Sequence, residues 1–99
     1  MAPLPREVWL VDLGMVAKTR PCLVMSPPPK DDELALHVLV ARTTAVRGNR
    51  WEVNLSLPGM QPGAFHLQQW HTVPRAKMLR RLGRQLMSEN RNDRTRISW

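Results

Sequence analysis

The chain has 99 residues, 42% of them hydrophobic, and carries a formal net charge of +7. This length suits a single small domain, and the apolar content is that of a globular protein. It contains no run of about 18 apolar residues, so we expect no membrane span. The N-terminus has no charged-then-apolar leader, which predicts a cytoplasmic protein. Cys22 is the only cysteine, which excludes an internal disulfide and favours a buried, inert thiol over a nucleophile.

Most of the positive charge lies near the C-terminus. Residues 75–99 hold eight Lys or Arg against two acidic residues, whereas residues 1–74 hold seven against six. Such a basic cluster attracts polyanions by releasing their counterions, and nucleic acid is the usual partner. A solvated tail that keeps the protein soluble and a surface for an acidic protein are the two alternatives.

The first half of the chain predicts three strands. Glu7–Asp12 places apolar side chains on both faces, which suits a strand in a small barrel. After a loop at 13–19, Arg20–Ser26 opens with Arg-Pro, and a proline at a strand start costs little because its missing N–H is not needed there. Residues 26–32 (SPPPKDD) predict a surface loop. Leu36–Thr43 is typical of a mostly buried central strand, and a Thr pair follows at its end.

The second half predicts two more strands and a helix. Gly48-Asn49 predicts a hairpin turn before the alternating strand Trp51–Leu55. After a second loop at 58–63, Ala64–Trp70 is a short strand. Thr72 is then suited to cap a helix that begins at Val73-Pro74. Its apolar stripe has near-helical spacing and lies opposite a basic face: Ala76, Leu79, Leu82 and Leu86 against Arg75, Lys77, Arg80, Arg81 and Arg84.

These elements predict a mainly β fold, a small SH3-like β-barrel of about five strands with one C-terminal helix. We expect residues 1–86 to form this single domain. Residues 87–99 are polar and basic and predict a flexible tail.

The sequence offers no metal site and no hydrolase triad. His37, His66 and His71 lack partner cysteines, an HExxH spacing and paired carboxylates. There is no GxSxG elbow and no glycine-rich phosphate loop. We therefore expect no metal and no cofactor. The remaining candidates are Arg, Thr, Gln and His side chains near strand ends, which are the groups that a metal-independent ribonuclease uses.

In such an enzyme, a ribose 2′-OH attacks the neighbouring phosphorus. The reaction needs a proton acceptor for that hydroxyl, a proton donor for the leaving 5′-oxygen, and positive charge beside the phosphorane oxygens. Arginine suits the last task through its fork of donors, but it is no base because its pKa lies above about 12. Threonine orients a phosphate without acting as a base. Histidine titrates near neutral pH, which makes His66 and His71 candidates for the base.

The order of these segments resembles the MazF/PemK-like toxin endoribonucleases of bacterial toxin–antitoxin modules. In that family, one motif is strand–loop–Arg-Pro–strand and a second is a strand that ends in Thr; here they correspond to TRPCLVMS and HVLVARTT. The block GNRWEVNL is similar to the family's (F/W)EVxL strand, and GAFHLQQWHTV to its segment with Gly, Ala and Gln. The resemblance covers about residues 5–83. The first loop, GMVAKT, lacks the family's acidic residue, and Lys18 occupies that region.

The resemblance implies a site and a reaction. Arg20 and Thr43 would be the catalytic pair, with Arg20 stabilising the phosphorane charge and Thr43 orienting the scissile phosphate. Thr44 takes the place of Thr43 if the register slips by one, and it is otherwise expected beside the substrate together with Lys18, Gln69 and His71. The implied activity is metal-independent, sequence-specific cleavage of single-stranded RNA such as mRNA, leaving 2′,3′-cyclic phosphate and 5′-hydroxyl ends. The implied partners are a second copy in a homodimer and a cognate antitoxin, whose acidic disordered tail fills the RNA groove.

Other interpretations stay open. The barrel can bind nucleic acid without cutting it, as an inactive toxin homologue would, or it can be a protein-interaction barrel of SH3 type. Arg20 would then merely pair with a strand neighbour: Glu7, Asp12 or Glu52. Trp51 and Trp70 suit the core, a dimer interface, or stacking on RNA bases.

Overall fold

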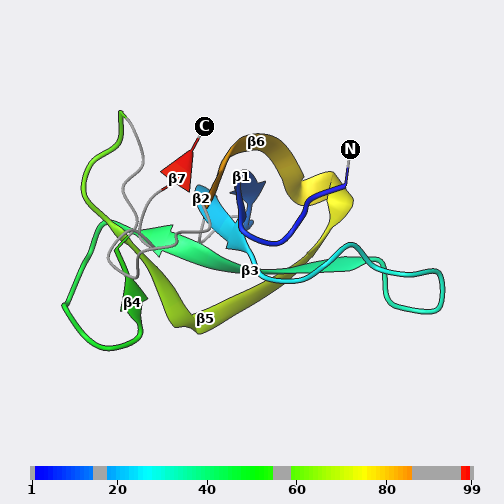
Figure 1. The fold of residues 1–99 in the computed structure, drawn as a ribbon, viewed down its shortest axis with the longest axis horizontal. Helices are drawn as coiled ribbons and strands as arrows, with labels where there is room; N and C mark the ends of the chain where they lie inside the picture. The colour runs from blue at the N-terminus through cyan, green and yellow to red at the C-terminus, as the bar shows by residue number, and fades with distance from the viewer. Residues whose placement is uncertain (1, 15–17, 55–58, 86–96, 99) are drawn as a thin grey trace.

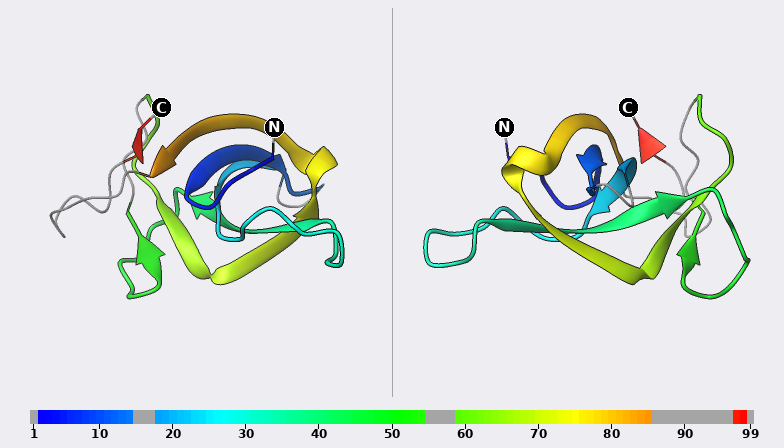
Figure 2. Two further views of the ribbon diagram at one scale, coloured as in Figure 1. Left: turned by 45° about the vertical axis from the view of Figure 1, so that its right-hand side comes forward. Right: turned by 180° about the vertical axis from the view of Figure 1, so that it is seen from behind.

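One antiparallel sheet makes up the fold. The computed structural model describes residues 2–14, 18–54, 59–85 and 97–98, and within them seven strands pair in the order β4-β5-β3-β2-β1-β6-β7. The strands are β1 (Glu7–Asp12), β2 (Thr19–Val24), β3 (Leu36–Thr43), β4 (Glu52–Val53), β5 (Ala64–Pro74), β6 (Met78–Gln85) and β7 (Ile97–Ser98), and the 3₁₀ turn η1 (Arg75–Lys77) joins β5 to β6. The sheet curls into an open barrel, with β6 arching over β1 while β3 and β5 run along the opposite side (Figure 1, Figure 2). The predicted mainly β fold is confirmed.

The sheet buries apolar side chains on both faces. Along β1, Trp9 and Val11 pack into one cluster and Val8 into another, because successive side chains of a strand point to opposite faces. Both clusters draw on β2 and β3 as well. The second cluster also includes Phe65 of β5, and Leu82 of β6 packs against it. The predictions of a two-faced strand at 7–12 and a mostly buried strand at 36–43 are confirmed.

The helix predicted from Val73 to Leu86 is wrong. Thr72 and Val73 belong to the long strand β5, and η1 covers only three residues and has no side-chain cap. Residues 78–85 form β6, which pairs with β1. Leu86 lies outside the described residues.

Two β-bulges explain why this strand resembles a helix in sequence. At two places, consecutive residues of β1 pair with residues of β6 that are two apart. Leu82 and Leu79 are the extra residues that these two steps leave unpaired with β1. A bulge shifts the two-residue alternation of a strand by one. Both bulge residues are leucines and lie three residues apart, which matches the spacing of a helix stripe although the backbone is extended and Leu79 is exposed.

Strand β5 pairs with a strand on each of its edges. It pairs with β3 from Pro74 to Trp70 and again at Phe65 and Ala64, and with β4 on the other edge at His66 and Phe65. The register with β3 shifts between the two stretches, and the ribbon of β5 turns a sharp corner (Figure 1). Strand β4 thus joins the sheet through β5, so the turn predicted at Gly48-Asn49 does not make a hairpin of β3 and β4. Of the strand predicted at Trp51–Leu55, Glu52–Val53 is extended, and Leu55 lies outside the described residues.

The C-terminal segment is described only in part. Ile97–Ser98 pairs with β6, while residues 86–96 and Trp99 lie outside the described residues. The domain boundary expected at residue 86 and the flexible tail therefore stay predictions. Among the residues that the structure describes, no helix is long and apolar enough to cross a membrane.

Candidate functional site

The two residues predicted to be catalytic lie at one end of the sheet, where β1 and β3 end and β2 and β5 begin. Strands β2 and β3 pair with Cys22 opposite Ala41. Continued by two residues, this register sets Arg20 opposite Thr43. Because residues two apart on a strand share a face, the Arg20 and Thr43 side chains lie on the face of Cys22 and Ala41.

Arg20 is exposed at the start of β2. The three acidic side chains considered as its structural partners are engaged by other groups. The carboxylate of Glu7 pairs with Arg81 and that of Asp12 with Lys77, while the Glu52 carboxylate accepts hydrogen bonds from the backbone of residues 47–49. The guanidinium of Arg20 is thus accessible to an anionic ligand.

Cys22 lies two residues further along the same face. Its side chain is fully buried, and this burial raises the pKa of the thiol to about 12, a shift that the positive charge of Arg20 partly opposes. A thiol of this kind stays protonated at physiological pH and is a poor nucleophile. The prediction that Cys22 is buried is confirmed.

Thr43 is half-buried at the end of β3 and its hydroxyl has a fixed position. The Oγ1 atom accepts a hydrogen bond from the Ala45 N–H at 3.0 Å. The hydroxyl proton remains able to donate to a ligand oxygen, because a threonine hydroxyl is both acceptor and donor. Thr44 is exposed and lies in the bend that follows the last residue of β3.

Lys18 lies at the same end of the sheet, in the loop between β1 and β2. Its N–H donates to the Gly14 carbonyl at 2.6 Å, and its carbonyl accepts from the Leu13 N–H at 2.9 Å. These bonds hold Lys18 in the left-handed region, at φ 57°, which is uncommon for a residue other than glycine. The exposed lysine side chain thus lies two residues before Arg20, next to the start of β2.

The other two predicted binding residues lie on β5. We call the end of the sheet that carries Lys18, Arg20 and Thr43 the strand-end site. Gln69 is exposed and lies next to it, in the irregular stretch between Phe65 and Trp70. His71 is half-buried opposite Leu39, which is four residues before Thr43 on β3 and hence about 13 Å away along the strand. The structure thus gathers Lys18, Arg20, Thr43 and Thr44 at one end, with Gln69 adjacent and His71 near the middle of the sheet.

Arg42 is a residue of this region that the sequence prediction missed. Its side chain is buried, burial lowers the pKa of its guanidinium, and one terminal nitrogen donates to the Gln61 carbonyl. A Cβ atom on Gly63 would lie 2.7 Å from the Arg42 Cζ atom and 2.7 Å from the Thr43 carbonyl oxygen. Arg42 and Gly63 therefore pack the 61–63 segment tightly against the end of β3 that carries Thr43. The signal in the sequence is a charged residue inside an otherwise apolar strand.

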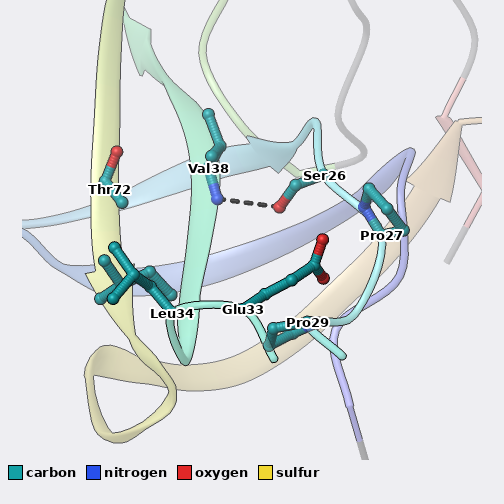
Figure 3. Close-up of a pocket in the computed structure, with 8 residues that line it drawn as sticks. Ser26, Pro27, Pro29, Glu33, Leu34, Val38 and Thr72 are labelled. Carbon is teal, nitrogen blue, oxygen red and sulfur yellow. Dashed lines mark hydrogen bonds between the residues drawn. The ribbon is translucent and has the colours of Figure 1, made fainter. Parts of the chain in front are cut away.

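A pocket of about 290 Å³ lies at the other end of β3. Figure 3 shows its lining, which includes the proline loop after β2 and the exposed Leu34. Ser26 borders it and accepts a hydrogen bond from the Val38 N–H at 2.9 Å. Val38 precedes Thr43 by five residues, about 16 Å along an extended strand. The pocket includes none of the predicted site residues, and its mostly apolar lining does not suit a polyanion.

Within the described ranges, no three His, Cys, Asp or Glu side chains gather as metal ligands would. His37 is buried in β3, where burial and the charge of Arg75 lower its pKa, and its Nδ1 atom has no hydrogen-bond partner among the described residues. His66 is half-buried on β5, and its Nδ1 accepts from the Gln68 N–H at 3.3 Å.

Fold and site together define a small β-barrel protein with polar and basic residues at adjoining strand ends. The family of PemK-like, MazF-like toxins of type II toxin–antitoxin systems matches residues 5–95, and the chain belongs to this family. The resemblance drawn from the order of the motifs is confirmed. Toxins of this family are known as endoribonucleases, and a type II system pairs its toxin with an antitoxin. No curated protein matches the chain.

Proposed function

We propose that this protein is the toxin of its module and acts as a metal-independent, sequence-specific endoribonuclease. It cleaves single-stranded RNA and leaves 2′,3′-cyclic phosphate and 5′-hydroxyl ends. The observation that carries the proposal is the β2–β3 register, which brings Arg20 and Thr43 to neighbouring strand ends in a member of this toxin family.

The chemistry follows from what these side chains can do. The substrate's own 2′-OH attacks phosphorus, so the protein has to orient the phosphate and stabilise the developing charge. The exposed Arg20 guanidinium directs two N–H donors at the non-bridging oxygens, where charge grows in the transition state. The Thr43 hydroxyl, held by the Ala45 N–H, donates to the same phosphate and fixes its orientation. Because arginine stays protonated, His66 is the candidate proton acceptor, since it lies on β5 two residues from Ala64, the pairing partner of Thr43, whereas His71 is too far along the strand to reach the same phosphate.

The remaining parts of the site hold the RNA chain. Lys18 and Thr44 lie beside the scissile phosphate, and Gln69 and His71 contact nucleotides further along β5. The net charge of +7 and the exposed arginines of β6 favour a polyanionic ligand. The same surface suits the acidic, disordered tail of an antitoxin, which would compete with RNA. We also propose a homodimer and a cytoplasmic location.

The decisive experiment incubates the full chain with a long, unstructured RNA in EDTA. Wild-type protein should give discrete fragments with cyclic-phosphate ends, and Arg20→Ala should give none. Arg6→Ala is the matched control, because it removes the same charge from an exposed position at the other end of β2, where the Arg6 N–H bonds to Val24. It should cleave like wild type.

Two results would contradict the proposal. Intact RNA with salt-sensitive gel retardation would make the protein a nucleic-acid-binding barrel or an inactive toxin homologue. Equal cleavage by wild type and Arg20→Ala would place the catalytic site elsewhere.

A further inference from the structure

Two tryptophans are exposed on the part of the sheet that lies beyond β3. Trp51, just before β4, is 39% exposed, and Trp70, on β5, is 53% exposed, whereas Trp9 is buried in the core. The core position considered for Trp51 and Trp70 is therefore wrong. Exposed indoles are unusual on a soluble protein surface and are enriched where proteins bind ligands.

Two hydrogen bonds to the backbone of Leu67 link the two tryptophans. The Leu67 N–H donates to the Trp51 carbonyl at 2.8 Å, and the indole N–H of Trp70 donates to the Leu67 carbonyl at 2.6 Å. With its N–H already bonded, the Trp70 indole offers mainly its aromatic face to a ligand. We call this pair, Trp51 and Trp70, the tryptophan platform.

The turn before Trp51 is held in place and carries positive charge. The Glu52 carboxylate accepts hydrogen bonds from the N–H groups of Arg47, Gly48 and Asn49, and the Asn49 side chain accepts from the Trp51 N–H at 2.9 Å. The Arg50 guanidinium lies 5.2 Å from the centre of the Trp51 ring. The backbone hydrogen bonds lower the pKa of Glu52 and keep its carboxylate ionised, but Arg47 and Arg50 outnumber it, so the three side chains together are positively charged. A preorganised surface loses little entropy when it binds.

We propose that bases of single-stranded RNA stack on the tryptophan platform while the same RNA chain occupies the strand-end site. This inference rests on the proposed function, since it assigns a second contact to the same RNA chain. Strand β4 lies three strand positions from β2 in the sheet, about 14 Å at ordinary strand spacing, and the loop at 44–51 runs directly from Thr43 to Trp51 (Figure 1). Aromatic faces beside arginines are the usual means of holding single-stranded nucleic acid irrespective of sequence.

Charge argues against a second copy of the chain as the occupant. In a two-fold dimer the same patch meets itself, so Arg47 and Arg50 would approach their own copies. The centre of a homodimer interface is depleted in charged residues. A polyanion, in contrast, is complementary to these arginines.

The test measures binding separately from cleavage. The probe is an unstructured oligonucleotide of fully 2′-O-methylated RNA, which has no attacking hydroxyl. Trp51→Leu and Trp70→Leu should each weaken its binding about tenfold, because each removes one base stack. The phenylalanine variants at both positions should stay within about threefold of wild type, since they keep an aromatic face. Leu34→Ala, a truncation of another exposed apolar side chain beside the pocket at the far end of β3, should bind like wild type.

Each outcome separates this inference from the proposed function. The platform is overturned if both leucine variants bind the probe with wild-type affinity, or if the leucine and phenylalanine variants lose the same amount of affinity. It is also overturned if the wild type sediments as a dimer and the leucine variants sediment as monomers that bind the probe unchanged. If wild type cleaves RNA and the leucine variants cleave with unchanged KM, the platform is wrong and the nuclease stands. If RNA stays intact but the probe binds with the expected dependence on tryptophan, the nuclease is wrong and the platform stands.

Discussion

Arg42 and Gly63 touch so closely that no side chain fits between them, since a Cβ atom on Gly63 would lie 2.7 Å from the Arg42 Cζ atom. The Thr43 carbonyl lies equally near, and a backbone atom cannot move without shifting the end of β3. We expect Gly63→Ala to lower the free energy of unfolding by about 1–3 kcal/mol, the usual cost of overpacking. RNA cleavage should fall with it. Urea denaturation measures the first effect, with Asn54→Ala as an exposed control; a Gly63→Ala variant as stable as wild type would show that the strand end yields freely.

The buried carboxylate of Glu7 joins three groups. It accepts hydrogen bonds from the Leu4 N–H at 2.8 Å and the Trp9 indole N–H at 3.1 Å, and its second oxygen lies 3.0 Å from the Arg81 Nε atom. Glu7→Gln removes the charge that pairs with Arg81, and we expect a loss of about 1–3 kcal/mol in thermal or urea unfolding.

The matched control for Glu7 is Asp12→Asn. Asp12 pairs with Lys77 at 3.6 Å, and both side chains are largely exposed. An exposed pair contributes little, so this change should cost at most about 1 kcal/mol. Equal losses in the two variants would mean that the burial of Glu7 does not strengthen its contacts.

The two threonines at the end of β3 are separable by substitution. Thr43→Val keeps the shape of the side chain and removes the hydroxyl, so we expect the cleavage rate to fall about 100-fold, as it does when one donor to a developing charge is lost. Thr43→Ser should retain most activity. The reverse pattern, in which Thr44→Val abolishes cleavage and Thr43→Val does not, would place the catalytic hydroxyl one residue further on.

Cys22 should make the protein sensitive to alkali. Its folded pKa of about 12 lies above the ordinary value of 9.0, so the folded state favours the protonated thiol. The resulting stabilisation is complete below about pH 9 and is lost as the pH rises towards 12, by up to about 1.4 kcal/mol per pH unit. Unfolding measured between these limits should show this slope, and the chain has no tyrosine whose ionisation would overlap with it. Cys22→Ala should lack the Cys22 contribution, and parallel pH curves for the two proteins would contradict the assignment.

The sequence was sufficient to predict those strands in which side chains alternate between the two faces of the sheet without a bulge. Strands β1, β2 and β3 follow their predicted bounds closely, because consecutive apolar residues there meet a core on each face. Strand β6 was mistaken for a helix because its bulges at Leu79 and Leu82 add residues that only the partner β1 reveals.

The site was predictable only where a motif is local. Arg-Pro and the Thr pair are visible in the chain, and the register of β2 with β3 brings them to the same end of the sheet. The contacts of Arg42 with Gln61 and Gly63 depend on how the corner of β5 folds, and a single sequence does not encode that corner in any short pattern. The exposure of Trp70 has the same origin, because tryptophan in a strand is ordinarily buried.

The burial of the single thiol has a practical use. Because Cys22 is enclosed and protonated, a thiol-directed dye will not attach to the folded wild-type protein at neutral pH. A cysteine introduced at the exposed Leu34 would then be the one site of labelling in the native chain. Such a dye, set apart from the strand-end residues, would report energy transfer to a labelled RNA and show in which direction the strand lies across the sheet.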